Sequence, residues 1–212
     1  MFLLSPKDIL ILILIIILFL IIFSIIIVLI WVLRYIEDSS ENKRSVYKQL
    51  NEHAKHNSIV FLGDSLTDFY RLDEFFKKKY IYNRGIANNN TDDVLNRLDD
   101  NVLQIGTNDL GQRKTCEYVL NNINKIIAIL QTELANVDIN IISLYPVNPK
   151  AMFTSKISVG KRKNKDIVYI NNELKKRCNE LGLTYIDVHS ALVDEHGDLR
   201  KEYTIEGLHI SL

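Results

Sequence analysis

Apolar and polar positions divide the chain into a continuous apolar run near the N-terminus and a longer region where short apolar runs alternate with amphipathic stretches. Residues 9–33 carry no charged side chain and Ser24 is their only polar one. A helix of this length crosses a hydrocarbon layer of about 30 Å. The run ends in Trp31, Arg34 and Tyr35, an aromatic and basic boundary that is typical of a membrane interface and unlike a signal-peptide cleavage site. We therefore expect a short tail over residues 1–8 and a transmembrane helix over residues 9–33.

The segment after this run is polar and charged, so residues 34–57 are interpreted as a linker that includes a short juxtamembrane helix. Only Lys7 precedes the apolar run, whereas Arg34, Lys43, Arg44 and Lys48 follow it. The loop-charge rule then puts the C-terminal side in the cytoplasm, although the rule weakens for long domains. The charge pattern therefore leaves the orientation open.

From residue 58 onwards, apolar runs typical of strands alternate with helical periodicity, which predicts βα units around a mainly parallel sheet. The five expected strands cover residues 59–62, 80–83, 102–105, 139–144 and 184–188. The expected helices cover residues 68–76, a stretch after a cap at Asn90 or Thr91, residues 115–135 and residues 166–181. Their inward positions include Phe69, Leu72, Phe75 and Phe76 in the first helix, Val119, Ile123, Ile126, Leu130 and Leu134 in the third, and Ile167, Ile170, Leu174, Cys178 and Leu181 in the last.

Composition adds little beyond this picture. The net charge is zero, so no global excess points to nucleic acid or to acidic partners. Cys116 and Cys178 have no metal-like spacing and each falls in an expected helix, which favours buried free thiols over a disulfide. No zinc spacing or phosphate-binding glycine loop is present in the sequence, and neither a metal nor a cofactor is expected.

Chemistry first suggests itself at Gly63-Asp64-Ser65-Leu66, directly after the first expected strand. A serine at the carboxyl end of a central strand and the start of a helix lies where open α/β sheets bind ligands. Its hydroxyl can attack a carbonyl while neighbouring N–H groups hold the developing negative charge. By itself the tetrapeptide favours a strand-to-helix turn in which Asp64 or Ser65 merely caps the helix.

Three later segments change this balance, because with them the chain resembles the GDSL, or SGNH, esterase and lipase family. Gly63-Asp64-Ser65-Leu66 matches the nucleophile block, and Asn83-Arg84-Gly85-Ile86 matches the glycine block. Gly106-Thr107-Asn108-Asp109-Leu110 matches the asparagine block, and Glu206-Gly207-Leu208-His209 matches the histidine block. Each block is weak alone, but four in this order are a strong signal covering residues 58–212.

The resemblance implies a three-layer α/β/α domain, flavodoxin-like, with a mainly parallel five-stranded sheet. It implies metal-free ester hydrolysis in which Ser65 is the nucleophile, His209 the general base and Glu206 the group that orients the histidine. Ser65, Gly85 and Asn108 are the expected oxyanion donors, the first two through their backbone N–H groups. Since tethered relatives act on envelope or external esters, the resemblance also favours a single-pass membrane protein with its catalytic domain outside the cytoplasm.

Three features depart from the family pattern. Glu206 stands where aspartate is usual, and a backbone carbonyl is an alternative partner for His209. Residues 99–101 connect a helix almost directly to the third strand, so a short strand is expected to displace Asn108. The chain ends at Leu212 without the usual C-terminal helix, which predicts a frayed His209. The alternative function is therefore a catalytically inactive, truncated binding or envelope module.

Other polar residues compete for roles. His189 follows the fifth strand near Asp187 and is a rival to His209, whereas His53, His56 and His196 are expected to be solvated. The loop 147–165 carries six basic residues, namely Lys150, Lys156, Lys161, Arg162, Lys163 and Lys165, and most of them are interpreted as solvated surface. An anionic headgroup or glycan is a second explanation for them. The expected substrate is an acetyl or short-acyl ester on a glycan, with a lysophospholipid next.

Overall fold

The computed structural model describes residues 5–55, 58–77, 80–97, 102–133 and 137–211. The chain divides into two compact units, Met1–Lys48 and Gln49–Leu212. The first is the larger part of α1 (Pro6–Asn51), a helix of 46 residues and about 69 Å in length. None of its side chains is buried, and its apolar part is long enough to cross a membrane. Helical structure continues through the polar segment to Asn51, so most of the expected linker is helix.

The second unit contains a five-stranded parallel sheet in the order β2-β1-β3-β4-β5. Its strands are β1 (Ile59–Gly63), β2 (Ile81–Gly85), β3 (Val102–Gln104), β4 (Asn140–Ile142) and β5 (Thr184–Ile186). All five expected strands exist, and the last three are shorter than the apolar runs that predict them. The sheet is the mainly parallel one that the resemblance implied.

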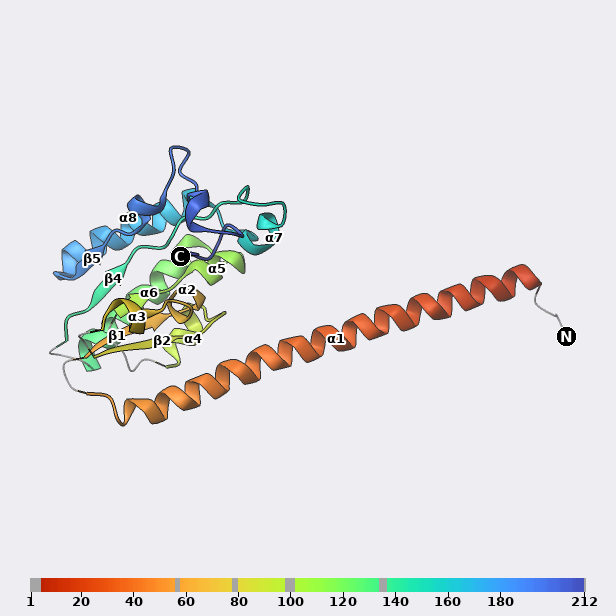
Figure 1. The fold of residues 1–212 in the computed structure, drawn as a ribbon, viewed down its shortest axis with the longest axis horizontal. Coiled ribbons are helices and arrows are strands. Elements are labelled where there is room, and N and C mark those ends of the chain that lie inside the picture. Colours follow the sequence, from red (N-terminus) through yellow and green to blue (C-terminus); the bar gives the residue numbers. More distant parts are fainter. Residues whose placement is uncertain (1–4, 56–57, 78–79, 98–101, 134–136, 212) are drawn as a thin grey trace. The chain divides into compact units, whose positions relative to one another are not determined.

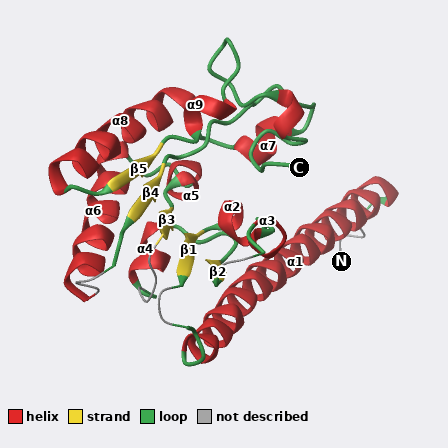
Figure 2. Cartoon of the chain, turned by 60° about the vertical axis from the view of Figure 1, so that its left-hand side comes forward, coloured by secondary structure: helices red, strands yellow, loops and turns green. Residues whose placement is uncertain are grey.

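Helices cover both faces of this sheet. Figure 2 shows α4 (Thr91–Leu95), α6 (Cys116–Glu133) and α8 (Asn164–Leu181) on one side and α2 (Ser65–Asp68) and α3 (Leu72–Phe75) on the other. The shorter elements are α5 (Thr107–Gly111), α7 (Ser155–Val159), α9 (His189–Leu192) and the 3₁₀ turn η1 (Lys201–Tyr203). Figure 1 shows these elements labelled and coloured in the order of the sequence.

The two long helices bury the faces that their periodicity predicts. Val119, Ile123, Ile126 and Leu130 of α6 are buried, as are Ile167, Ile170, Leu174 and Cys178 of α8. They pack with the sheet residues Leu62, Leu103 and Ile141 in one core. Leu134, which was expected to face inward, lies outside the described residues. Gly182 ends α8 in the left-handed conformation, at φ 67°.

The expected helix over residues 68–76 was wrong in its extent and its buried face. Two single-turn helices, α2 and α3, take its place, and only Leu72 of the four expected inward residues is buried. Phe69, Phe75 and Phe76 are 62%, 55% and 41% exposed. The periodicity failed here because the chain after Ser65 turns at Tyr70 and Arg71, so the four side chains do not share one helical face.

The order of the strands places the site. Chain order reverses between β1 and its neighbour β3, because β2 lies on one side of β1 and β3, β4 and β5 on the other. In an open α/β sheet the carboxyl ends of the strands at such a reversal border a crevice. The segment after β1 carries Ser65 and the segment after β3 carries Asn108. The crevice therefore brings together two of the four sequence blocks.

Candidate active site

Ser65 is the first residue of α2, in a tight turn after β1. Gly63 makes the turn possible, since a Cβ there would lie 2.2 Å from Thr67 Oγ1 and 2.6 Å from the Gln104 carbonyl oxygen. The N-cap is Asp64, whose carboxylate accepts the N–H of Leu66 at 2.9 Å. Because Asp64 performs the capping, the hydroxyl of Ser65 remains available for another partner.

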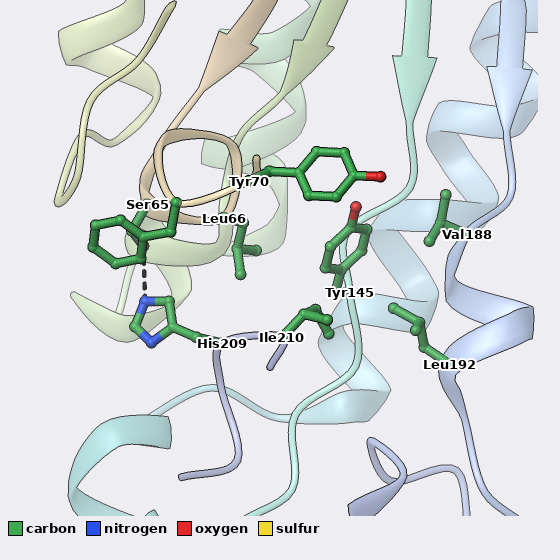
Figure 3. A pocket seen from close by; sticks show the side chains of 9 residues that line it. Ser65, Leu66, Tyr70, Tyr145, Val188, Leu192, His209 and Ile210 are labelled. Carbon is green, nitrogen blue, oxygen red and sulfur yellow. Dashed lines mark hydrogen bonds between the residues drawn. The ribbon is translucent and has the colours of Figure 1, made fainter. Parts of the chain in front are cut away.

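That partner is His209, which comes from the other end of the unit. Ser65 Oγ lies 2.9 Å from His209 Nε2, across a sequence separation of 144 residues, and Figure 3 shows this contact as a dashed line. His209 Nδ1 lies 2.6 Å from Glu206 Oε1. A hydroxyl, an imidazole and a carboxylate therefore form a continuous chain, the arrangement in which an imidazole can take the hydroxyl proton while the carboxylate orients it.

The segment that carries His209 is fastened to the unit by its backbone. Glu206 accepts the N–H of His209 at 2.7 Å and that of Leu208 at 3.2 Å, in addition to the imidazole. Gly207 donates to Thr204 Oγ1 at 2.9 Å and accepts from the N–H of Asn148 at 2.7 Å. These bonds hold the described segment as far as Ser211, whose N–H donates to Tyr203. They are the physical reason why the frayed His209 expected from the sequence is not what the structure contains.

Asn108 lies in α5 and is buried. Its Nδ2 donates to the carbonyl oxygen of Asn89 at 2.9 Å, and its Oδ1 accepts from Arg162 Nη2 at 2.7 Å. The third strand has only three residues, as expected, but Asn108 is held by partners from two other segments. The displacement that the short strand predicted is therefore opposed by tertiary contacts.

The N–H of Gly85, an expected oxyanion donor, already has a hydrogen-bond partner in the structure. Its N–H donates to Asn83 Oδ1 at 2.8 Å, and a Cβ at this position would lie 2.2 Å from the N–H nitrogen of Asp68. Three residues later, Asn88 has φ 70° in a turn closed by a bond from the N–H of Asn89 to Ile86 O. Within the described part of the chain, no hydrogen bond from the N–H of Asn88 is found. The sequence analysis did not single out Asn88, although its Asn-rich loop was a signal for a positive-φ turn.

Two carboxyl groups are buried beside Ser65. Burial raises the pKa of Asp64 to about 7, against opposing effects of the Leu66 N–H and the Arg162 guanidinium. Burial also raises the pKa of Asp109, which accepts the N–H and the hydroxyl of Thr91 at 3.0 and 2.6 Å. Asp109 thereby ties α5 to the start of α4.

An apolar pocket of about 210 Å³ adjoins the Ser65–His209 contact. It is lined by Ser65, Leu66, Phe69, Tyr70, Tyr145, Val188, Leu192, His209 and Ile210. In Figure 3 the rings of Tyr70 and Tyr145 lie in its middle, and Val188 and Leu192 lie on the side away from Ser65. Burial raises the pKa of Tyr145 to about 12, so its phenol stays protonated at neutral pH. The pocket can accept an apolar group attached to a carbonyl at Ser65.

His189 does not share this contact. Its backbone N–H donates to Ser143 Oγ at 2.8 Å, and burial lowers the pKa of its imidazole. His53 and His196 are exposed, and His56 lies outside the described residues. Cys116 and Cys178 are free thiols, as expected, but only Cys178 is buried and Cys116 is partly exposed. Among the residues that the structure describes, no group of three or more His, Cys, Asp or Glu side chains is arranged to hold a metal ion.

Known proteins of similar sequence and fold include lipases and acylhydrolases. Residues 61–212 match the model of the GDSL-like lipase/acylhydrolase family. No curated protein matches the chain. A solved structure from Streptococcus pneumonia, provisionally described as a platelet activating factor, is 31% identical with a TM-score of 0.77, over 84% of this chain and 88% of the other.

Two further solved structures are similar in fold. One is a GDSL-like lipase from Bacteroides thetaiotaomicron, 19% identical with a TM-score of 0.68, over 79% of this chain and 89% of that one. The other is the acetyl xylan esterase AlAXEase, 18% identical with a TM-score of 0.57, over 73% of this chain and 91% of that one.

Proposed function

The chain belongs to the GDSL-like lipase/acylhydrolase family, and from this premise we propose that it hydrolyses carboxylic esters through an acyl-enzyme on Ser65. The observation that carries the proposal is the continuous chain of contacts from Ser65 through His209 to Glu206. The hydroxyl of Ser65, the imidazole of His209 and the carboxylate of Glu206 come from two segments far apart in the sequence, and each lies at hydrogen-bond distance from the next. A general base within hydrogen-bond reach of a hydroxyl is what nucleophilic catalysis by serine needs.

The reaction proceeds in two halves. Ser65 Oγ attacks the ester carbonyl carbon while His209 Nε2 takes the hydroxyl proton, and the electron pair of the C=O bond moves to the oxygen. His209 returns the proton to the alkoxy oxygen, the bond from carbon to that oxygen breaks, and the alcohol leaves. Water then attacks the acyl carbon while His209 Nε2 takes one of its protons. The bond from that carbon to Ser65 Oγ breaks, His209 returns the proton to Oγ, and the carboxylic acid is released. Glu206 accepts a hydrogen bond from Nδ1 of His209 and so holds the imidazole in one orientation throughout.

The developing oxyanion needs donors that are already in place. We assign this role to the N–H of Ser65, which precedes the internal hydrogen bonds of α2, and to Asn108 Nδ2, which keeps one N–H beyond its bond to Asn89. Gly85 can contribute only by exchanging its bond to Asn83 for one to the substrate. The N–H of Asn88, which has no hydrogen-bond partner among the residues that the structure describes, is a further candidate donor on the same loop.

The substrate that we propose is an acetyl or short-acyl ester of a glycan or a lipid. One fold relative is named as an acetyl xylan esterase, which supports the glycan acetyl ester. The pocket of about 210 Å³ supports the short-acyl member, since an engineered apolar cavity of about 150 Å³ holds a benzene ring and an acetyl group is much smaller. We also propose that α1 anchors the enzyme in a membrane, with the catalytic unit on the outer side.

The test is labelling of the detergent-solubilised full chain with a fluorophosphonate probe, followed by hydrolysis of p-nitrophenyl esters from acetate to octanoate. We expect wild type and Ser190→Ala, an exposed serine on α9, to label and to hydrolyse, and Ser65→Ala to do neither. His209→Ala should abolish hydrolysis while His189→Ala retains it. A folded wild-type protein without Ser65-dependent labelling would instead support the catalytically inactive module.

A further inference from the structure

Arg162 lies in the lysine-rich loop between α7 and α8, where the sequence predicts mostly solvated charge. The structure places it differently from the neighbouring Lys161 and Lys163, which are exposed. Its side chain turns inward and is partly buried against α5, the helix that carries Asn108. Gly111 at the end of α5 lies against the guanidinium, since a Cβ there would be 2.7 Å from Arg162 Cζ.

The guanidinium of Arg162 donates to five oxygen atoms. Nε donates to the carbonyl oxygen and to Oγ1 of Thr107, at 2.8 and 3.2 Å. Nη1 donates to the carbonyl oxygens of Ser158 and Val159 at 3.2 and 3.1 Å. Nη2 donates to Asn108 Oδ1 at 2.7 Å, the shortest of the set. The planar fork thus joins the end of α7 to the first turn of α5, with Asn108 as its only side-chain amide.

These contacts determine which way the amide of Asn108 faces. Arginine has only donors, so the atom that it meets must be the amide oxygen. A carbonyl oxygen has only acceptors, so the atom that meets Asn89 O must be the amide nitrogen. With both ends assigned, the amide cannot turn over without losing two hydrogen bonds. Its remaining N–H is therefore held in one direction.

The charge of Arg162 also strengthens that N–H as a donor. A cation bonded to an amide oxygen draws electron density from the amide nitrogen, and bonds in such a chain polarise one another. Burial lowers the pKa of Arg162, and the nearby Asp64 and Glu206 oppose this shift. Asp64 precedes the nucleophile and Glu206 contacts the histidine, so the positive charge lies within the electrostatic reach of both ends of the site.

We infer that Arg162 is a positioning residue for ester hydrolysis, which locks and polarises the side-chain amide of Asn108 so that it meets the oxyanion as a preorganised donor. This inference rests on the proposed function. It gives the loop between α7 and α8 a role in turnover that neither the resemblance nor the charge pattern assigns. Because Arg162 acts through Asn108, its removal should lower kcat and leave KM nearly unchanged.

The experiment is a double-mutant cycle in the full chain, with Arg162→Gln, Asn108→Ala and the double variant. Removing an oxyanion donor costs about 10²–10³-fold in kcat, and we expect about that loss for Asn108→Ala. Arg162→Gln leaves the donor present but unlocked, so we expect a loss of about 10-fold. The double variant should match Asn108→Ala within about twofold, because Arg162 has nothing left to position.

A merely structural role for Arg162 would give a different pattern. Its loss would then lower kcat by the same factor in the presence and absence of Asn108, and such additivity would overturn the inference. Gly111→Ala provides a second variant, because it pushes the guanidinium away while leaving its charge in the protein. It should lower kcat in the same direction, whereas Lys161→Gln, which removes an exposed charge from the same loop, should have no effect.

A readout that needs no turnover separates this inference from the proposed function. We expect the side-chain amide resonances of Asn108, assigned by comparison with Asn108→Ala, to shift in Arg162→Gln and to exchange faster with solvent. Unchanged resonances would contradict the inference even in an active enzyme. Absence of Ser65-dependent hydrolysis in the wild type would instead contradict the proposed function, while the resonances would still report whether Arg162 locks the amide.

Discussion

At the scale of single residues, Asp64 and Glu206 have different environments, since Asp64 is buried and Glu206 is partly exposed. Asp64 is 1% exposed and accepts only the N–H of Leu66 among the hydrogen bonds of the described residues, so its neutral form is favoured. Glu206 has the opposite environment, since three N–H groups of its own turn point at its carboxylate. Asp64 is thus suited to hold a proton, whereas the partly exposed Glu206 accepts hydrogen bonds from its own turn.

Asp64 makes stability depend on pH. Its folded pKa of about 7 lies above the ordinary value of 3.8, so the folded state holds the proton more tightly than the unfolded state. The resulting stabilisation is fully present below pH 3.8 and is lost as the pH rises to about 7. Asn is also a good N-cap and does not titrate, so Asp64→Asn should remove this dependence. As the pH rises from 3.8 to about 7, the free energy of unfolding of the wild type should fall relative to that of the variant by at most roughly 4 kcal/mol.

The measurement for Asp64 is urea unfolding of both proteins from pH 4 to pH 8, followed by near-ultraviolet circular dichroism of the tyrosines. The quantity of interest is the difference between the free energies of unfolding at each pH, because other groups titrate equally in both proteins. A difference that stays constant over this range would show that the buried carboxyl is ionised throughout.

Glu206 should be required for turnover through its charge. Glu206→Gln keeps the shape of the side chain but puts an amide beside His209, so the imidazole loses the anion that stabilises its protonated form. We expect kcat to fall by about 10⁴-fold, the loss seen when the acid of a Ser-His-Asp site is changed to its amide. Steady-state hydrolysis of a p-nitrophenyl ester measures this. Glu202→Gln, an exposed glutamate in η1, is the matched control, and equal activities of the two variants would remove Glu206 from the site.

At the scale of elements, the site depends on how closely the histidine segment approaches the chain after β4. Gly207 has φ 90°, and a Cβ there would lie 2.0 Å from the carbonyl oxygen of Asn148. The carbonyl oxygen of Gly207 also accepts a hydrogen bond from the N–H of Asn148. Residues 204–209 therefore lie against residues 147–149 as two backbones in contact, which only glycine permits.

Gly207→Ala should separate these two segments and move His209 away from Ser65. The matched control is Gly197→Ala, at φ 78° with nothing within 4 Å of the added Cβ, which isolates backbone strain from the clash. We expect Gly197→Ala to cost about 1–2 kcal/mol of stability and to leave activity intact. Gly207→Ala should cost more than this, since the clash adds to the strain, and should lower kcat. Thermal unfolding and ester hydrolysis of both variants test this, and equal losses would count against the close approach.

At the scale of the whole molecule, the chain combines an apolar helix with a unit of the GDSL-like lipase/acylhydrolase family. The apolar part of α1 has no buried residue, and its lone hydroxyl, Ser24, donates to the carbonyl oxygen of Leu20 at 2.8 Å. A helix with its polar groups satisfied internally is the form that a hydrocarbon layer accepts. We propose that residues 9–33 remain in the mature protein as a span and are not removed as a signal sequence.

Membrane fractionation of expressing cells tests this proposal. We expect the full chain to stay in the membrane after an alkaline carbonate wash, with an N-terminus that mass spectrometry shows to be intact. Leu18→Arg combined with Ile22→Arg should release it or prevent insertion, because each arginine at a helix centre costs about 2.5–3.5 kcal/mol. Recovery of a soluble chain lacking residues 1–33 would identify a signal sequence. Protease treatment of intact cells then reports the side on which the catalytic unit lies.

The sequence alone determined the elements and the chemistry that they carry. The buried faces of α6 and α8 follow from local patterns, since burial imposes a period on each helix. The choice of Ser65, Asn108 and His209 rests on the order of four sequence blocks that resemble a known family, and their roles stay a prediction. The sequence predicted a cap at Asn90 or Thr91, and the structure has Asn90, whose side chain accepts the N–H groups of Asp92 and Asp93. These are properties of neighbouring residues, which a sequence records directly.

Tertiary structure decided which of several similar residues takes part. No local pattern shows that Arg162, unlike the lysines around it, contacts Asn108. Nor does one show that the N–H of Gly85 is bonded to Asn83, or that Leu72 is buried while Phe69 is exposed. The pairing of Ser65 with His209 depends on where two segments 144 residues apart come to rest on one sheet. Such choices are made by packing and hydrogen bonding between distant segments, because the energy of each contact depends on both partners and only the folded chain brings them together.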